Sequence, residues 1–274
     1  MLVRRVTDVS RMSRSRAQQW IESGAVLVDG AVAGRPSIRV REGALVEVAL
    51  PDTAAARTRP GPEPGTLSVL YEDADILALD KPPGIVVHPS YKNVSGTLLN
   101  TILWRVRDRA DVRPGIVTRL DKDTSGLMLV SLTPGVHARL QRSPIRKEYL
   151  AIVAGVPRPP SGTIEASLGR DPNDRRRVVV VRDGLPSATR YEVLSSENGV
   201  SLVRCELVTG RTHQIRVHMA ERGWPLIGDA MYGVADARLP RQALHSWRAT
   251  FEHPITGAAL TITAPLPDDM RQLL

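Results

Sequence analysis

The sequence is poor in cysteine and in long apolar runs, and each shortage excludes a class of protein. Cys205 is the sole cysteine among 274 residues, so an intrachain disulfide is impossible and a reducing compartment fits. No apolar stretch reaches the ~18 residues of a membrane-spanning helix. Arg4 and Arg5 stand where a signal peptide would be apolar. The sequence therefore predicts a soluble, cytoplasmic protein with no membrane partner.

Motifs for cofactors are missing as well. The sequence contains no Gly-rich phosphate loop and no strand followed by Gly-x-Gly-x-x-Gly and a helix. Asp121 and Asp123 are two carboxylates two residues apart, too few to define a cation site. His213 and His218 lie five residues apart on a predicted helix, so they do not share one face. We expect no cofactor and no metal.

Basic residues outnumber acidic ones. Lys and Arg total 37 against 29 Asp and Glu, which gives a formal net charge of +8. An excess of this kind favours a polyanionic partner, and nucleic acid is the default candidate, although a solvated basic surface is the alternative. Only four Trp, five Tyr and one Phe are present, too few to read a sequence by stacking on many bases. We expect recognition of RNA through its shape and charge.

A segment rich in Pro, Ala and Gly divides the chain. Residues 51–65 have this composition and are predicted to be a linker between a small unit, 1–50, and a larger unit, 66–274. In the larger unit many short strands occur with few helices and no regular alternation of the two. This pattern predicts an α+β fold with a mixed, largely antiparallel sheet. The strands are expected at 67–71, 76–79, 85–87, 127–132, 149–153, 191–194 and 202–208, and the helices at 97–106 and 212–222.

The small unit carries a basic helix. Apolar spacing predicts a helix over 13–23, strands over 25–28 and 45–50, and a tight turn at Asp29-Gly30. Arg11, Arg14 and Arg16 lie at the start of this helix and are candidates for binding RNA phosphates. The order resembles the small α+β RNA-binding domain named after ribosomal protein S4. Because residues 1–12 are poorly periodic, the sequence leaves open a missing first helix or a different translation start.

A polar loop between two apolar runs is the first candidate for chemistry. It reads Arg119-Leu120-Asp121-Lys122-Asp123-Thr124-Ser125-Gly126. Scaffolds often present catalytic carboxylates in this way, although a surface turn closed by glycine has the same composition. The loop alone does not decide between the two interpretations.

Seven motifs in one order decide it. They are Lys81-Pro82-Pro83-Gly84 with His88-Pro89; Arg119-Leu120-Asp121 with Thr124-Ser125-Gly126; Lys147-Glu148-Tyr149-Leu150-Ala151; Gly210-Arg211-Thr212-His213-Gln214-Ile215-Arg216; Gly228-Asp229-Ala230-Met231-Tyr232-Gly233; Arg241-Gln242-Ala243-Leu244-His245; and His253-Pro254 with Thr256-Gly257. Together they resemble the RluA/RluD-type pseudouridine synthases over nearly all of 66–274. The resemblance implies a pseudouridine synthase fold with a central active-site cleft, a cofactor-free RNA uridine isomerase and an RNA partner. Large-subunit ribosomal RNA is favoured and tRNA is the other choice; monomer is the default state.

The resemblance assigns roles to named residues. Asp121 corresponds to the catalytic aspartate, Tyr149 to the tyrosine beside the target base, and Arg216 to the partner of the carboxylate. Arg119 matches the arginine that fills the space left by the flipped uridine. Two departures stand out. Thr118 replaces the usual histidine, which we expect to tune activity, and Ala230 replaces a proline.

The start of the predicted strand at 149–153 and the catalytic step itself leave more than one interpretation. Arg146 and Lys147 are candidates for the RNA backbone. The carboxylate could attack C1′, attack C6 or remove the proton from C2′. Two other functions are compatible with the sequence: a non-catalytic RNA-binding or ribosome-assembly protein on an inactive synthase fold, and a metal-dependent transferase that uses both Asp121 and Asp123.

Overall fold

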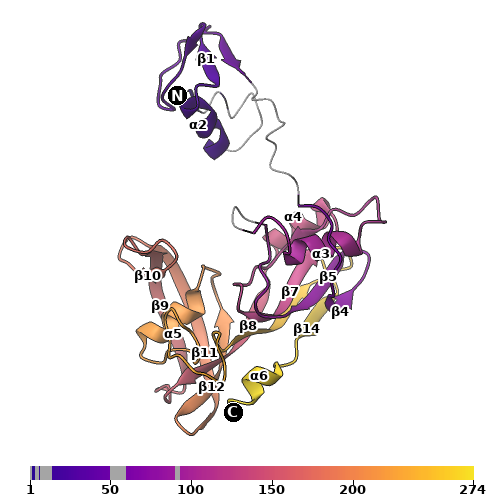
Figure 1. Ribbon diagram of the computed structural model, residues 1–274, viewed down its shortest axis with the longest axis vertical. Coiled ribbons are helices and arrows are strands. Elements are labelled where there is room, and N and C mark those ends of the chain that lie inside the picture. The colour runs from indigo at the N-terminus through magenta and orange to yellow at the C-terminus, as the bar shows by residue number, and fades with distance from the viewer. Residues whose placement is uncertain (1, 4–5, 7–13, 50–59, 90–92) are drawn as a thin grey trace. The chain divides into compact units, whose positions relative to one another are not determined.

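The chain folds into two compact units, Met1–Arg59 and Pro60–Leu274. The computed structural model describes residues 2–3, 6, 14–49, 60–89 and 93–274 (Figure 1). Among these residues, no helix is both long and apolar enough to cross a membrane. Most of the predicted linker lies outside the described residues. Its last part belongs to the larger unit, because the Glu63 amide donates to the Asn100 carbonyl at 3.0 Å.

The small unit consists of a helix and a three-stranded antiparallel sheet. Helix α2 (Arg14–Glu22) precedes β1 (Val26–Val28), β2 (Ala31–Val32) and β3 (Val46–Val48), and β1 is the central strand. Asp29 and Gly30 have φ of 51° and 78°, the left-handed conformation of a tight hairpin turn. Leu2, Val3 and Val6 are helical and buried in the same core as α2, so the beginning of the chain contributes helical residues that its weak periodicity did not predict.

An eleven-stranded mixed sheet forms the larger unit. Along the sheet the strands follow the order β10-β9-β11-β12-β8-β13-β7-β5-β4, with β14 on β13 and β6 on β7. Every pair is antiparallel except β13 with β7. The strands are β4 (Ser68–Glu72), β5 (Ile76–Lys81), β6 (Gly115–Ile116), β7 (Ser125–Ser131), β8 (Arg146–Ala154), β9 (Ser161–Arg170), β10 (Val178–Val180), β11 (Leu185–Glu197), β12 (Val200–Leu207), β13 (Leu244–Glu252) and β14 (Ala259–Thr263). This confirms the predicted α+β class.

Strands β5 and β7 are buried on both faces. Alternate residues of β5 enter two different cores: Leu77 and Leu79 one, Ile76 and Ala78 the other. Helix α3 (Leu98–Arg105) supplies Leu98 and Ile102 to the first core, and α4 (Pro134–Arg142) supplies Val136 and Leu140 to the second. Because both faces are covered, these strands have continuous apolar runs, which made them easy to predict.

The other half of the sheet packs against α5 (Gln214–Glu221). Ile215 and Met219 of this helix share a core with Tyr191 of β11 and Val203 of β12. The short α6 (Asp268–Arg271) adds Met270 to a separate cluster around β8. Figure 1 shows α5 beside the β9–β12 half of the sheet and α3 beside the β5–β7 half.

The strand predicted at 85–87 is wrong. These residues form no strand, and their carbonyl groups find other donors. Val86 and Val87 accept from the first amides of α3, and Ile85 accepts from the Lys81 ammonium. The apolar run therefore anchors a loop to a helix start, where orphan backbone groups need partners.

Candidate active site

Asp121 stands in the loop between β6 and β7 and lines a cavity of about 560 Å³. Its side chain is 29% exposed, so a ligand in the cavity can reach it. The loop is held by a hydrogen bond from the Thr124 amide to the Asp121 carbonyl at 3.2 Å. Residues from both halves of the sheet line the cavity: Val86, Val87, His88, Ile116, Val117, Thr118, Arg119, Leu120, Lys122, Thr124, Gln141, Lys147, Tyr149, Leu207, Gly210, Arg211, Thr212, His213, Gln214, Ile215, Arg216 and Leu244.

Arg216 connects Asp121 to a second, fully buried carboxylate. The Arg216 side chain donates from Nη1 to Oδ2 of Asp121 at 3.3 Å. Its Nε and Nη2 donate to Oδ2 and Oδ1 of Asp229 at 2.6 and 2.8 Å, a bidentate pair. Burial raises the pKa of the Asp229 carboxyl, but the hydrogen bonds from Arg216 and two backbone amides outweigh it and leave the pKa below its usual value. Both partners are therefore charged.

His213 approaches the same oxygen of Asp121. Its Nε2 lies 3.7 Å from Oδ2 of Asp121, and its Nδ1 lies 2.8 Å from the Tyr232 hydroxyl. His213 is the N-cap residue just before α5 and has φ of 55°, a left-handed conformation that is uncommon for residues other than glycine. Burial lowers the pKa of His213 and outweighs the opposing charge of Asp121, and Arg216 adds to the lowering, so the imidazole is neutral at neutral pH.

Tyr149 is a buried tyrosine on β8 in the wall of the cavity. Burial raises the pKa of Tyr149 to about 12, and the charge of Asp121 acts in the same direction. Its hydroxyl is therefore protonated at neutral pH. Because Tyr149 and Asp121 line the same cavity, the tyrosine ring offers an apolar surface to a ligand bound there.

The two basic residues predicted at the start of β8 lie on opposite faces of the sheet. Lys147 lines the cavity, and burial lowers its pKa. Arg146 points to the other face, where it pairs with Glu206 at 2.9 Å and with the buried Glu148 at 3.4 Å. The period-two alternation of a strand separates these neighbours. The structure thus brings Lys147, but not Arg146, to the candidate site.

Of the other predicted RNA contacts, Arg119 is exposed at the cavity. In the described part of the chain, no acidic group lies within 4.0 Å of its guanidinium, so it is available to a phosphate. Arg14 and Arg16 belong to α2, but their side chains lie outside the description. Arg11 lies outside the described residues altogether.

One group of potential metal ligands occurs in the described residues, away from the cavity. It contains Asp73, Asp75 and His253. Both oxygens of Asp73 are already occupied: Oδ1 accepts from the amides of Asp75 and Ile76, and Oδ2 accepts from Tyr71 and faces His253 Nε2 at 3.0 Å. These contacts close the turn between β4 and β5, so the group has a structural explanation.

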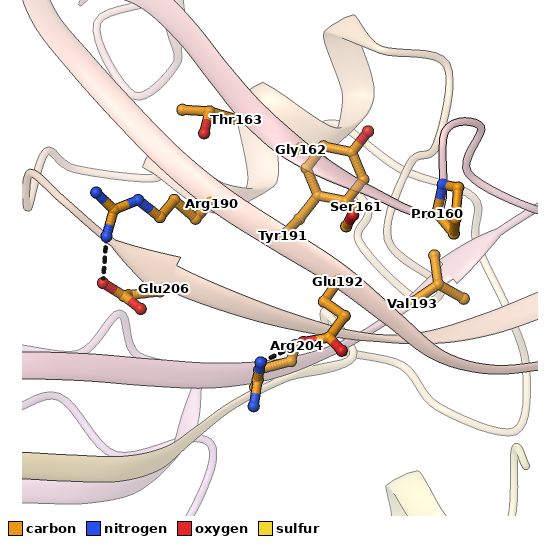
Figure 2. Close-up of a pocket in the computed structure, with 10 residues that line it drawn as sticks. All are labelled: Pro160, Ser161, Gly162, Thr163, Arg190, Tyr191, Glu192, Val193, Arg204 and Glu206. Carbon is orange, nitrogen blue, oxygen red and sulfur yellow. Dashed lines mark hydrogen bonds and ion pairs between the residues drawn. The ribbon is translucent and has the colours of Figure 1, made fainter.

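A second depression, of about 630 Å³, lies over β9, β11 and β12 (Figure 2). Its charged side chains are paired with one another. Arg190 donates to Glu206 at 3.0 Å, and Arg204 pairs with Glu192. Both carboxylates of this depression are neutralised by arginine at the surface, and no histidine or lysine lines it. The cavity around Asp121 is therefore the candidate active site.

The sequence matches the RNA pseudouridylate synthase family over residues 75–221. The chain belongs to this family. Residues 12–46 match the S4 domain, which confirms the resemblance of the small unit. The chain is thus an RNA pseudouridine synthase, an isomerase, with an S4 domain at its amino-terminal end, and the recognition from its motifs is confirmed.

Relatives with curated names agree. The chain is 41% identical over 271 residues to an uncharacterized RNA pseudouridine synthase of Bacillus subtilis, covering 96% of this chain and 88% of the relative. It is 43% identical over 281 residues to the ribosomal large subunit pseudouridine synthase D of Pseudomonas aeruginosa, covering 96% and 87%. Among solved structures, human RNA pseudouridylate synthase domain containing 1 superposes with a TM-score of 0.58 at 26% identity, covering 74% of this chain and 86% of that one.

Three residues of the site received no role from the sequence. His213 stands in the motif that contains Arg216, and Asp229 and Tyr232 stand in the Gly228–Gly233 motif, but the resemblance assigns a role to none of the three. The structure brings all three to the neighbourhood of Asp121. The sequence does not show that these residues lie close together, because α5 and the loop after it separate His213 from Asp229 and Tyr232.

Proposed function

We propose that this enzyme converts uridine to pseudouridine in large-subunit ribosomal RNA, with Asp121 as the catalytic carboxylate. The observation that carries the proposal is a partly exposed carboxylate, Asp121, in a cavity whose lining contains cationic side chains and no second acidic residue. Relatives named for the large ribosomal subunit support the choice of RNA. We further propose that the protein acts as a cytoplasmic monomer.

The net reaction needs no external reagent. The N1–C1′ bond of the nucleotide breaks, the C5–C1′ bond forms, C5 loses its proton and N1 gains one. In this proposal Asp121 supplies the carboxylate for attack at C1′ or C6, or for removal of the C2′ proton. Arg216 donates a hydrogen bond to that carboxylate and holds it in one orientation.

The remaining residues act on the RNA. Tyr149 places its ring beside the uracil that has left its stack; extrusion of a base costs a few kcal/mol. Arg119 fills the space left in the RNA helix, and Lys147 neutralises a phosphate near the cavity. We propose that residues 1–50, with Arg11, Arg14 and Arg16, bind RNA, that 51–65 connect the units, and that 66–274 catalyse. Arg146, on the opposite face of the sheet, could contact RNA only outside the cavity.

Release of tritium from transcripts that carry [5-³H]uridine tests the proposal, because formation of the C5–C1′ bond expels the hydrogen from C5. Wild type should release tritium from a large-subunit transcript, and Asp121→Ala should release none. Asp123→Asn is the matched control: the same charge is removed two residues away, outside the cavity lining, and turnover should persist. Turnover by Asp121→Ala would overturn the catalytic assignment, and turnover on tRNA alone would overturn the choice of substrate.

A further inference from the structure

The oxygens of the Asp121 carboxylate have different surroundings. Oδ2 faces two nitrogens, Arg216 Nη1 at 3.3 Å and His213 Nε2 at 3.7 Å. Oδ1 receives no hydrogen bond from any residue that the structure describes. A carboxylate held by one oxygen keeps the lone pairs of the other for an incoming reactant.

Each nitrogen that faces Oδ2 is itself held by another side chain. The Asp229 carboxylate accepts two hydrogen bonds from Nε and Nη2 of Arg216. These bonds fix the guanidinium so that Nη1, on its other side, faces Asp121. The Tyr232 hydroxyl contacts Nδ1 of His213 at 2.8 Å. Asp229 also accepts a hydrogen bond from the Tyr232 amide at 3.1 Å. One buried carboxylate therefore positions both Arg216 and the tyrosine that contacts His213.

The hydroxyl of Tyr232 determines which ring nitrogen of His213 carries the proton. The hydroxyl oxygen already accepts the Val178 amide at 2.7 Å, so its own hydrogen is left to donate. His213 Nδ1, at 2.8 Å, is the acceptor it meets in the described part of the protein. In a neutral imidazole the proton then resides on Nε2, the nitrogen that faces Asp121.

We propose that Asp229 and Tyr232 are positioning residues, which hold Arg216 and the Nε2–H tautomer of His213 against Oδ2 of Asp121 and so leave Oδ1 for the uridine. This inference rests on the proposed function of Asp121. It differs from a structural role for the two residues because it concerns the orientation of one carboxylate and the tautomer of one imidazole.

Nitrogen-15 NMR of histidine-labelled protein tests the tautomer without any turnover. Wild type should show His213 as a single Nε2–H tautomer, and Tyr232→Phe should lose this preference while the phenyl ring stays in place. Tyr71→Phe is the matched control, because its hydroxyl contacts Asp73 away from the cavity and its loss should leave the His213 signal unchanged. A wild-type His213 protonated on Nδ1, or a Tyr232→Phe signal identical to wild type, would overturn the proposal.

Single-turnover kinetics test the consequence. Tyr232→Phe should slow the chemical step roughly 10-fold, the usual effect of one hydrogen bond in a charged network, with the Kd for RNA unchanged. His213→Asn should slow it equally and should not add to Tyr232→Phe in the double variant, because the two act in series. Additive losses, or a loss confined to RNA binding, would contradict the proposal.

Asp229→Asn tests the contact between Asp229 and Arg216, because asparagine keeps the shape of the side chain and removes its charge. The chemical step should slow roughly 100-fold, because the buried Arg216 loses its charged partner. Thermal unfolding measured beside it shows whether the variant folds; if it does not, the Tyr232→Phe results decide. A folded Asp229→Asn with the wild-type rate would contradict the role of Asp229. An inactive wild-type protein would instead refute the proposed function. The NMR experiment would still test the tautomer of His213, because it does not depend on turnover.

Discussion

Replacement of Lys81 by methionine should destabilise the protein although it removes a buried charge. Lys81 is fully buried at the end of β5. Its ammonium donates to the carbonyls of Pro82 at 2.8 Å, Ile85 at 3.2 Å and Lys122 at 2.8 Å. The third bond connects β5 to the residue after Asp121. Lys81→Met keeps the length of the side chain and deletes all three hydrogen bonds.

The magnitude follows from two opposed effects. In Lys81→Met the carbonyl of Lys122 still accepts a hydrogen bond from the Gly84 amide, so the carbonyls of Pro82 and Ile85 are the two that lose their partner. Each costs about 1–3 kcal/mol, and the lost bond to Lys122 adds about 1 kcal/mol. Burial lowers the pKa of Lys81 from 10.5 to about 8, so relief of the buried charge at pH 7 returns roughly 3 kcal/mol. We expect a net loss of about 2 kcal/mol in the free energy of unfolding.

The change of stability with pH gives a second, independent test of the role of Lys81. Because the pKa of Lys81 is lower in the folded protein, the unfolded chain binds the proton more tightly between pH 8 and 10.5. Deprotonation therefore favours the folded wild type as the pH rises through this window. The advantage of wild type over Lys81→Met should grow by about 1.4 kcal/mol per pH unit.

Urea unfolding followed by circular dichroism at pH 7 and pH 9.5 measures both quantities. Lys122→Met is the control, because the side chain of Lys122 is exposed and only its carbonyl takes part. This control should stay within about 0.5 kcal/mol of wild type. A Lys81→Met protein as stable as wild type at both pH values, or an advantage of wild type that shrinks as the pH rises, would refute the reasoning.

Three further predictions concern other parts of the larger unit. Burial lowers the pKa of His245 to about 4, so the folded protein favours the neutral imidazole. The stability that His245 contributes is therefore complete above pH 6.5 and falls by about 1.4 kcal/mol per pH unit as the pH drops from 6.5 toward 4. The difference in unfolding free energy between wild type and His245→Asn should narrow over that range, and a constant difference would contradict the assignment. Gly126 has φ of 106° and its added Cβ would meet the carbonyl oxygen of Ser246, so Gly126→Ala should lower the midpoint of thermal unfolding by several degrees, and an unchanged midpoint would contradict the model of a close strand approach. Lys147→Met should weaken RNA binding and reduce its salt dependence by about one counterion, whereas Arg146→Met, on the opposite face, should do neither; equal effects would contradict the assignment of faces.

The chemistry of the site was predictable from the sequence where it lies in short motifs. Asp121, Tyr149 and Arg216 come from three segments with recognisable neighbours, and the structure brings all three to one cavity. Strands β7 and β8 were predicted from continuous apolar runs, because burial on both faces leaves a strong signal, and β12 from its alternation of buried and partly exposed residues.

What the sequence could not supply are contacts over long separations and the partners of buried charges. The parallel pairing of β7 with β13 joins His245 to Ser125, and no local pattern encodes it. Strand β9 was missed because four of its first five residues are exposed and polar or small. Lys81 has the sequence appearance of a surface lysine at a strand end, and its burial depends on three carbonyls that only the folded chain brings together.

The central claim is that Asp121 is the group that carries the isomerisation. Its most direct test is the pseudouridine content of a large-subunit rRNA transcript, measured by nucleoside chromatography after incubation with wild type or with the isosteric Asp121→Asn. We expect pseudouridine from wild type and none from Asp121→Asn, although both proteins bind the transcript with the same Kd. Pseudouridine formed by Asp121→Asn at the wild-type rate would contradict the account.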